Sequence, residues 1–523
     1  MNKLKYILFF IAFASITFSC SKALELGPED YFGEGNFWQN ESQVKNFMVG
    51  LHKQFRDNQF MFIRLGEMRG GGFSNIDRQN TSLNELPIIE QALDENSAGV
   101  GNWAGFYGPI LQLNLFIQKV EPLSFLTQET KDYLLAQAYA MRSYYYFHLL
   151  RTYGGVPLRT EPEVLGGLTD PVALRKERAP EEEVLQLVKS DVDKAVLLFG
   201  NAAVPADKSL WNPWAAKMLQ GEVYLWSAKL YNKPEDLTIA KNALNSINGP
   251  VLLDDFSRVF AYNNKNNPEI ILSTRFRVGE AEMSNVATFT YSTFNFDGQH
   301  YKDSLASGPL LVDPLNITAT NSMQIIQRYG YTFELFESYD INDQRRNATF
   351  YDYYKVNTSV NPHVVTVKNT ALVKFLGTID ANKRYFADDW VVYREAERLL
   401  MLAEIVNAEN GDPSPYIKQI RDRAFGGPGN DPSPFVNGSK DENELAIFEE
   451  RMKEFVYEGK QWYDLRRMKI GNEPLAFKSN QHPYGVLDKG TEAHKLLWPI
   501  PPSIWTNDPL VNQTPGYPTA KPQ

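Results

Sequence analysis

The sequence predicts a mainly α-helical protein in which paired helices form a tetratricopeptide-like scaffold. Several long stretches place apolar residues three and four positions apart, which is the spacing of a helix with one buried face. These stretches come in pairs around 131–199, 211–247, 394–423 and 444–468, as helix-pair repeats do. Residues 276–389 lose this spacing and are rich in aromatic, Asn, Gly and Thr residues. They predict an irregular, loop-rich insertion that carries binding residues, although a loop that only caps the helix ends remains an alternative.

Composition bounds the class of protein. With 523 residues, 43% hydrophobic and 22% charged, the chain is long enough to bury a large core. Its formal net charge is −10, and no run of basic residues occurs. Both features argue against a nucleic-acid-binding surface.

The first residues predict export and lipid anchoring. Lys3 and Lys5 precede an apolar run at 6–18 that is too short to span a bilayer, so residues 1–19 are interpreted as a signal peptide. Cys20, the only cysteine in the chain, follows directly and resembles the lipid-modified, palmitate-bearing first residue of a bacterial lipoprotein. An incidental cysteine is the alternative. Residues 20–36 are polar and glycine-bearing and predict a tether.

A single domain is expected over 37–523, with the helical scaffold at about 37–275 and 390–523 and the insertion at about 276–389. The periodicity predicts helices at 37–55, 180–199, 211–230, 237–247, 394–410, 415–423 and 444–468, and a short strand at 266–272. The proline-rich run at 497–502 cannot be helical and is expected to cross the surface as an extended strap.

Residues 134–158 are the most informative stretch. Their apolar side chains fall on two neighbouring helix faces, so this helix is expected to lie inside the stack. Gly154 and Gly155 can close the helix, and Pro157 cannot continue it. Tyr144, Tyr145 and Tyr146 point about 100° apart on a helix, so packing is favoured over sugar contact for these three side chains.

The candidate ligand-binding residues combine aromatic rings with amides and charges. A ring can stack on the apolar face of a sugar while amides and carboxylates bond its hydroxyls. For Trp103 a sugar contact and a core anchor are left equally open. We expect ligand contacts from two loops and one helix start: Arg69, Asn75, Asp77, Asn102, Trp103, Tyr291, Phe294 and Tyr301.

Six blocks of sequence carry a family resemblance. Residues 138–158 read AYAMRSYYYFHLLRTYGGVPL, 267–271 read NPEII, and 393–404 read YREAERLLMLAE. Residues 450–467 read ERMKEFVYEGKQWYDLRR, and the chain closes with LWPIP at 497–501 and NQTPGY at 512–517. In this order the blocks resemble the SusD/RagB family, the surface glycan-binding lipoproteins of Bacteroidetes outer membranes.

The resemblance implies a SusD-like fold. No cofactor is expected, and no metal-site motif is found in the sequence. The resemblance also implies that the chain captures an oligosaccharide at the cell surface, held to the outer membrane by its lipid anchor, and covers a SusC-like TonB-dependent transporter as a lid. Capture of peptides, as in RagB-like members, remains the alternative; the aromatic run at 291–301 favours glycan.

A glycoside hydrolase is the third hypothesis, since it needs only two suitably placed carboxyl groups. The acids singled out by their spacing do not favour it. Glu450, Glu454 and Glu458 recur at four-residue spacing, and Arg451, Arg466 and Arg467 are expected partners in a structural charge network. The adjacent pairs Asp388-Asp389 and Glu449-Glu450 are expected to be solvated. No hydrolase or metal-site motif occurs, and the six histidines are scattered, so a catalytic role is not predicted.

Overall fold

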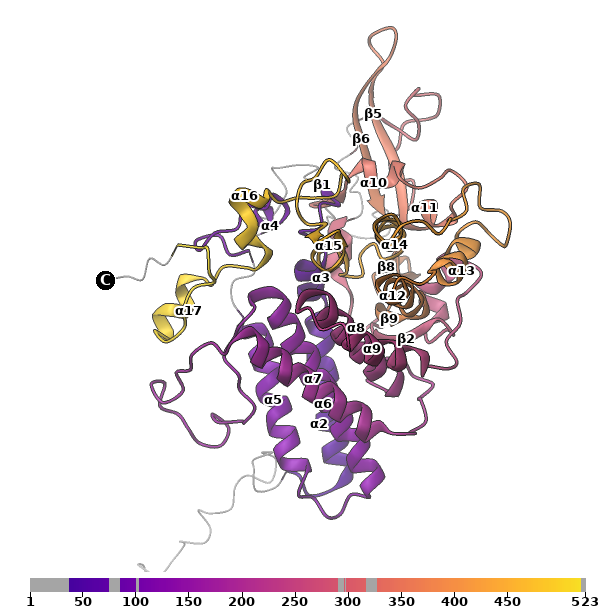
Figure 1. Cartoon of the computed structure of the whole chain (residues 1–523). Coiled ribbons are helices and arrows are strands. Elements are labelled where there is room, and N and C mark those ends of the chain that lie inside the picture. The colour runs from indigo at the N-terminus through magenta and orange to yellow at the C-terminus, as the bar shows by residue number, and fades with distance from the viewer. Residues whose placement is uncertain are drawn as a thin grey trace, which may run out of the picture.

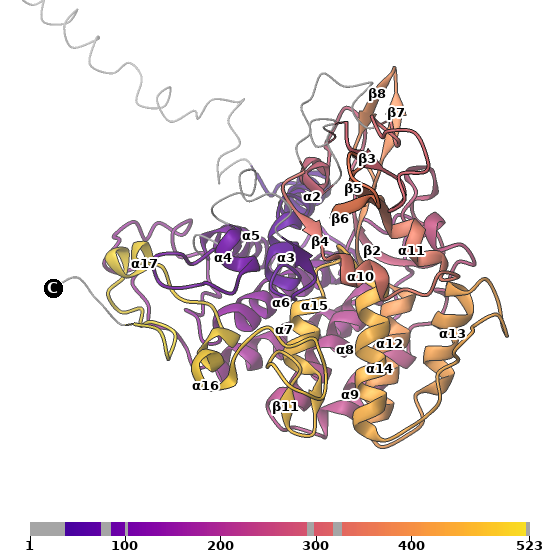
Figure 2. The same ribbon diagram turned by 90° about the horizontal axis from the view of Figure 1, so that it is seen from above.

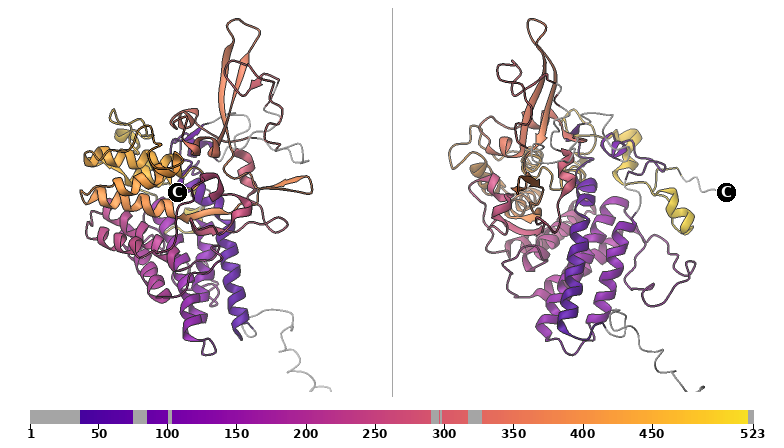
Figure 3. Two further views of the ribbon diagram at one scale, coloured as in Figure 1. Left: turned by 90° about the vertical axis from the view of Figure 1, so that its right-hand side faces the viewer. Right: turned by 180° about the vertical axis from the view of Figure 1, so that it is seen from behind.

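The computed structural model describes residues 37–74, 85–99, 103–289, 296, 298–316 and 327–518. It is 45% helical and 10% strand. Helices layered beside one another form the body of the molecule, and a long β-hairpin stands out from it (Figures 1 and 3). Among the described residues no helix is both long and apolar enough to cross a bilayer.

The predicted helix pairs are present. In the N-terminal half, α6 packs against α5 and α7, and α8 packs against α7 and α9; in the C-terminal half, α12 packs against α13 and α14 (Figure 2). The main helices are α2 (Glu41–Asp57), α3 (Gln59–Gly66), α5 (Ala104–Val120), α6 (Gln128–Tyr153), α7 (Glu181–Phe199), α8 (Pro213–Leu230), α9 (Asp236–Asn245), α12 (Glu395–Ala408), α13 (Ser414–Ala424), α14 (Lys440–Glu454) and α15 (Gln461–Arg467). The shorter ones are α4 (Leu86–Ile89), α10 (Phe333–Glu337), α11 (Gln344–Thr349), α16 (Lys489–Glu492) and α17 (Pro502–Asn507).

Helix α6 is the buried centre of the N-terminal half. From Leu134 to its end nearly every side chain is buried, which confirms packing on more than one face. The rings of Tyr144, Tyr145 and Tyr146 are all buried, so the prediction of structural packing is confirmed. Gly154 ends the helix with φ 71°, the left-handed conformation that glycine adopts without strain.

The insertion contains more regular structure than the sequence predicts. Strands β3 (His300–Tyr301), β5 (Phe350–Asn357) and β6 (Val364–Leu372) form an antiparallel sheet, and β5 and β6 make the projecting hairpin (Figure 1). A second hairpin joins β7 (Thr378–Asp380) to β8 (Lys383–Tyr385). The predicted strand near 266–272 is β2 (Ile270–Thr274), which pairs with β9 (Trp390–Arg394) at the start of α12.

Two expectations for the C-terminal part are wrong. The predicted helix at 444–468 is two helices, α14 and α15, because Tyr457 and Gly459 between them have φ of 63° and 73°, which no α-helix accommodates. The tail is extended at 497–501 as expected, but it is not a surface strap. Trp498 and Ile500 are buried, and the Trp498 N–H donates to the Thr152 carbonyl at the end of α6 (2.8 Å).

A buried network of ion pairs joins the C-terminal elements. Glu454 is paired with Arg345 of α11, Arg394 of β9 and Arg423 of α13. Glu450 is paired with Arg345 and Arg421, and Glu458 with Lys374 and Arg394. The predicted network is confirmed, but its expected partners are wrong. Arg451 and Arg467 both pair with Asp464, and Arg467 also pairs with Glu404. Arg466 donates to the Arg151 carbonyl.

Candidate ligand-binding site

The two loops that carry candidate residues, which follow Ser74 and Phe289, begin at one place in the fold. Strand β1 (Phe73–Ser74) pairs antiparallel with β4 (Gly330–Tyr331), so the chain after Ser74 starts beside the chain that leads into β4. The Phe289 ring lies 5.7 Å from that of Phe73, and the Arg328 N–H donates to the Thr288 carbonyl (2.8 Å). The described residues that flank 75–84, 290–295 and 317–326 therefore meet at β1 and β4. Asn75, Asp77, Asn102, Tyr291 and Phe294 lie outside the described residues, as does Cys20, and remain predictions.

Aromatic side chains form a packed floor under this meeting point. The Phe289 ring lies 5.1 Å from Tyr329 and 4.8 Å from Tyr457, and the Phe73 ring lies 4.5 Å from Tyr331 (centroid distances). These rings are buried. They fix where the loops leave the body but do not themselves offer a surface to a ligand.

Glu67, at the C-terminal end of α3, fixes β4 against the segment between α14 and α15. Its carboxylate accepts hydrogen bonds from the Tyr331 hydroxyl (2.6 Å) and from the backbone N–H groups of Tyr457 (2.6 Å) and Gly459 (2.7 Å). Burial raises the pKa of Glu67 to about 7, against the opposite influence of those hydrogen bonds. The group is structural, since its oxygens are already used.

An aromatic row leads outward from this floor along the projecting hairpin. Tyr301 of β3 lies directly opposite Tyr354 of β5, so both side chains point to the same face of the sheet. The Phe333 ring of α10 lies 5.7 Å from the Tyr354 ring, and the Lys368 ammonium lies 5.2 Å from the Phe333 centroid. All three rings are half-buried. They can present ring faces to a sugar, with a cation and backbone groups alongside.

Of the described candidate residues, Tyr301 is the one that keeps an accessible side chain. Tyr354 and Phe333 were missed by sequence reasoning. The three tyrosines within the strand-forming stretch YDYY at 351–354 were the local signal that could have drawn attention to Tyr354. No local signal marks Phe333, whose position beside the hairpin depends on tertiary packing.

The structure corrects the prediction for Arg69. Its side chain is 0% exposed, and its guanidinium carbon lies 4.2 Å from the Trp462 ring centroid and 5.6 Å from that of Trp498. The Arg69 Nε donates to Gln91 (2.9 Å). A ligand at the surface cannot reach a guanidinium enclosed in this way, so Arg69 holds the tail and α15 against the N-terminal helices.

The structure also corrects the prediction for Trp103. Its side chain is 8% exposed, and its ring packs edge-on against Tyr107 and Tyr153 at 6.0 and 5.4 Å. Of the two interpretations left open by the sequence, the core anchor at the start of α5 is the one observed. A buried ring cannot serve as a platform for a sugar.

A cavity of about 400 Å³ lies close to the same loops. It is lined by Arg64 of α3, by Glu95, Asn96 and Ser97 of the segment after α4, and by Ser503 of α17. Arg64 is paired with Glu85, and its guanidinium carbon lies 5.5 Å from the Phe60 centroid. Hydroxyl, amide and charged groups in one hollow are suited to a hydroxyl-bearing ligand.

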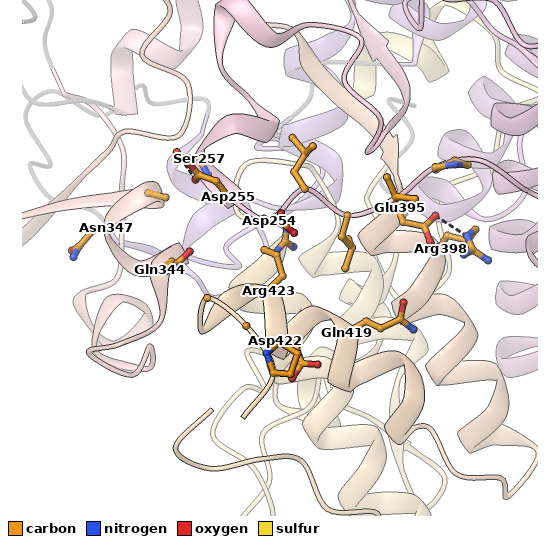
Figure 4. Close-up of a pocket in the computed structure, with 18 residues that line it drawn as sticks. Asp254, Asp255, Ser257, Gln344, Asn347, Glu395, Arg398, Gln419, Asp422 and Arg423 are labelled. Carbon is orange, nitrogen blue, oxygen red and sulfur yellow. Dashed lines mark hydrogen bonds and ion pairs between the residues drawn. The ribbon is translucent and has the colours of Figure 1, made fainter. Parts of the chain in front are cut away.

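A larger cavity lies elsewhere, on the face made by α11, α12, α13 and residues 250–257. Its volume is about 1350 Å³. Figure 4 shows Gln344 and Asn347 on one side, Gln419, Asp422 and Arg423 of α13 below, and Glu395 paired with Arg398 at the start of α12. None of the predicted ligand-binding residues lines it.

Three of the four acids in the adjacent pairs that the sequence singles out are buried. The expectation that Asp388 and Asp389 are solvated is wrong, since both are buried. Asp389 is ion-paired with Arg275 (2.7 Å) and Lys265 (2.9 Å). Glu450, also expected to be solvated, is buried between two arginines. Within the described ranges no group of three or more His, Cys, Asp or Glu residues could hold a metal ion.

Comparison with known proteins gives a consistent result over most of the chain. A model described as "SusD family" matches residues 287–517, and one described as "Starch-binding associating with outer membrane" matches residues 30–225. SusD-like protein P25 of Formosa agariphila is 25% identical over 509 residues, which is 90% of each chain.

Solved structures agree with these matches. A SusD superfamily protein from Bacteroides fragilis is 35% identical, with a TM-score of 0.83 over 92% of this chain and 100% of its own. The NanU protein of B. fragilis is 30% identical, with a TM-score of 0.81 over 94% of this chain and 100% of its own. The mainly α, tetratricopeptide-like fold and these matches together show that the chain belongs to the SusD superfamily, whose members are generally non-catalytic, glycan-binding proteins of the outer membrane.

Proposed function

We propose that this protein binds an oligosaccharide at the cell surface without cleaving it and delivers it to a SusC-like TonB-dependent transporter, which it covers as a lid. The observation that carries the binding step is the half-buried aromatic row of Tyr301, Tyr354 and Phe333 beside the meeting point of the candidate loops. The family's general glycan binding supports the choice of ligand class.

The row would bind sugar by stacking and hydrogen bonding. Each ring can cover the apolar face of one sugar residue, while hydroxyls bond polar groups at the edges. Because the row lies along an open hairpin, each sugar residue would be covered on one side only. Modest affinity is the expected consequence, and it suits a protein that must release its ligand to a transporter.

The charges around Glu454 argue against a catalytic role for that carboxylate. A glycosidase acid needs a raised pKa next to the scissile bond. Glu454 has its pKa held below the ordinary range: burial would raise it, but Arg423, Arg394 and Arg345 outweigh that effect. A carboxylate held in this way is a poor proton donor.

The membrane and transporter parts of the proposal are supported by family and sequence. The matched family is described as associated with the outer membrane, and Cys20 follows a signal-peptide pattern. A lipid chain at Cys20, separated from α2 by residues 21–40, would keep the domain near the membrane and near a transporter in it.

Peptide is the second candidate ligand, and one feature favours it. Strand β6 is an edge strand of the described sheet β3-β5-β6, and an extended peptide can pair with such an edge through its backbone. Glycan remains preferred because the half-exposed side chains on the adjoining face are aromatic rings.

Isothermal titration calorimetry with the chain from residue 21 onward tests the ligand class and the site. Against a panel of neutral polysaccharides and tryptic peptides, we expect binding of at least one polysaccharide. Substituting Tyr301→Ala and Tyr354→Ala together is expected to weaken that binding about 10-fold or more, since two ring contacts of ~0.5–1.5 kcal/mol each are lost.

Tyr351→Ala is the matched control, because Tyr351 is half-buried on the same strand but points to the opposite face. It should leave affinity within about 2-fold. Equal losses of affinity in the control and in the double variant would show that the aromatic row is not the binding site. Binding of peptides alone would show that glycan is not the ligand.

A further inference from the structure

A small pocket on another face of the molecule contains an acidic group that the fold leaves incompletely bonded. The pocket has a volume of about 260 Å³, which corresponds to roughly nine water molecules at ~30 Å³ each. It is lined by residues of the 257–263 segment, by Lys374, and by Gly377, Thr378 and Asp388 around the β7–β8 hairpin. Ser257 lines both this pocket and the 1350 Å³ cavity, so the two hollows adjoin.

Asp388 is the unusual group in this lining. It is 3% exposed, and its Oδ2 accepts the Gly377 N–H (2.6 Å). Its Oδ1 is buried and has no hydrogen-bond partner among the described residues. A buried oxygen without a partner destabilises the fold, whereas the neighbouring Asp389 has two ion-pair partners. Such an oxygen is what a ligand hydroxyl would satisfy.

The backbone around Asp388 is built for this placement. Gly377, which donates to Oδ2, has φ +67°, and a Cβ there would lie 1.8 Å from the Tyr385 carbonyl oxygen. Only glycine fits at this position. The hairpin therefore holds one carboxyl oxygen rigidly and leaves the other buried without a partner among the described residues.

The charges around the pocket select a neutral ligand. Lys374 donates to the Glu454 and Val456 carbonyls and to the Glu458 carboxylate (3.2, 2.9 and 2.6 Å), so all three of its protons are used and none remains for an anion. The Lys265 ammonium lies 4.6 Å from the Tyr262 ring centroid and donates to the Ala387 carbonyl (2.7 Å). It would repel a cationic ligand. Burial also raises the pKa of Asp388 to about 7, so near neutral pH the carboxyl is available both as donor and as acceptor.

The rim supplies the groups that sugar sites use. Tyr262 is half-buried and offers an aromatic ring, and exposed Asn263 and half-buried Thr378 offer an amide and a hydroxyl. Aromatic ring, amide and carboxyl around a hollow of this size suit one sugar residue, with any longer chain continuing past Ser257 into the larger cavity.

We propose that this pocket, lined by Tyr262, Asn263, Thr378 and Asp388, is a second saccharide site that takes one neutral sugar residue. It rests on the proposed glycan-binding function but uses residues separate from the aromatic row of Tyr301 and Tyr354.

Saturation-transfer NMR on the chain from residue 21 onward tests the site with D-glucose, D-galactose, D-mannose and D-xylose as probes. We expect transfer to at least one of them. Asp388→Asn and Tyr262→Ala are each expected to weaken that binding 10-fold or more. Both should fold: Asn is isosteric and can still accept the Gly377 N–H, and Tyr262 is at the surface. Asp380→Asn, an exposed acid on the same hairpin, is the control and should change nothing.

The double variant Tyr301→Ala with Tyr354→Ala separates this proposal from the proposed function. Monosaccharide signals that persist in the double variant and vanish in Asp388→Asn support the second site. The second site is overturned by any of three results: monosaccharide signals that vanish in the double variant, signals that are unchanged in Asp388→Asn, or no signal for any of the four sugars. The proposed glycan binding through Tyr301 and Tyr354 would still be supported by calorimetry in these cases. Preferential binding of glucuronate or of ethanolamine overturns the neutral-ligand assignment.

Discussion

Arg69 shows how the environment of one residue can be opposite to what its neighbours in sequence suggest. It precedes three glycines, a pattern that predicts an exposed loop. In the fold its guanidinium lies against Trp462 and Trp498, both from the last part of the chain. Burial lowers its pKa to about 9. Exposure was unpredictable here because it depends on segments far away in sequence, and the same holds for Trp103, which Tyr153 covers.

The accessible side chain of Tyr301 was predictable, because it depends on a local property of the sequence. Its side-chain direction follows from strand alternation, which is a local property. Its partner Tyr354, however, was identified only once the pairing of β3 with β5 was known, because strand register is a tertiary property.

Glu67 leads to a pH-dependence prediction at the residue scale. Its pKa is about 7 in the fold and about 4.5 in an unfolded chain. Between these values the folded state holds a proton that the unfolded state has lost, so Glu67 makes stability fall as pH rises from about 4.5 to 7. We expect Glu67→Gln to reduce this pH-dependent loss in the free energy of unfolding by a few kcal/mol.

Urea denaturation at a series of pH values measures the effect. The free energy of unfolding of the variant minus that of the wild type should rise between pH 4.5 and 7 and stay constant above. Asp388 contributes a slope of the same sign in both proteins, so it cancels in the difference. A difference that is independent of pH would contradict the protonated state of Glu67.

At the scale of elements, Glu454 connects α14 to three other parts of the C-terminal half. Its partners come from α11, β9 and α13, and neither Glu454 nor Arg394 is exposed. The spacing of Glu450, Glu454 and Glu458 was enough to predict a network. Its true partners were not predictable, because Arg345 and Arg423 reach it through packing and not through helix periodicity.

Glu454→Leu should strongly destabilise the protein. It leaves arginines buried without their shared anion, and breaking a buried pair in this way costs about 3–5 kcal/mol. Chemical denaturation monitored by circular dichroism measures the loss. Asp57→Asn, which removes the partner of exposed Lys53, is the control and should cost less than ~1 kcal/mol. Similar losses in both variants would show that the Glu454 network contributes little.

At the scale of the whole molecule, the sequence predicted the helix pairs, the insertion and the family. Periodic helices such as α6 and α12 were predictable because their burial pattern is encoded locally. The break between α14 and α15 was missed. The type of Tyr457 gives no warning of its left-handed backbone, but Gly459 within the predicted helix was a local signal.

Attachment to the membrane is a whole-molecule prediction that rests on Cys20. Cys20→Ala should leave the fold unchanged and move the protein from the membrane fraction to the soluble fraction, because the acyl chains supply the membrane affinity. Fractionation followed by immunoblotting, with metabolic palmitate labelling, measures both effects. Wild-type protein without label, or a variant that remains in the membrane fraction, would show that Cys20 is not the anchor.

The burial of the last residues has a consequence for how the chain is made. Trp498 packs on Arg69 and bonds Thr152, Lys495 bonds Gln91, and Arg178 bonds Asn512. The N-terminal helices are thus completed by residues that are made long after them. Contacts between such distant parts of a sequence slow folding. A nascent chain should therefore stay open until residues 495–512 have been made, and an open polypeptide can still be threaded through a secretion channel.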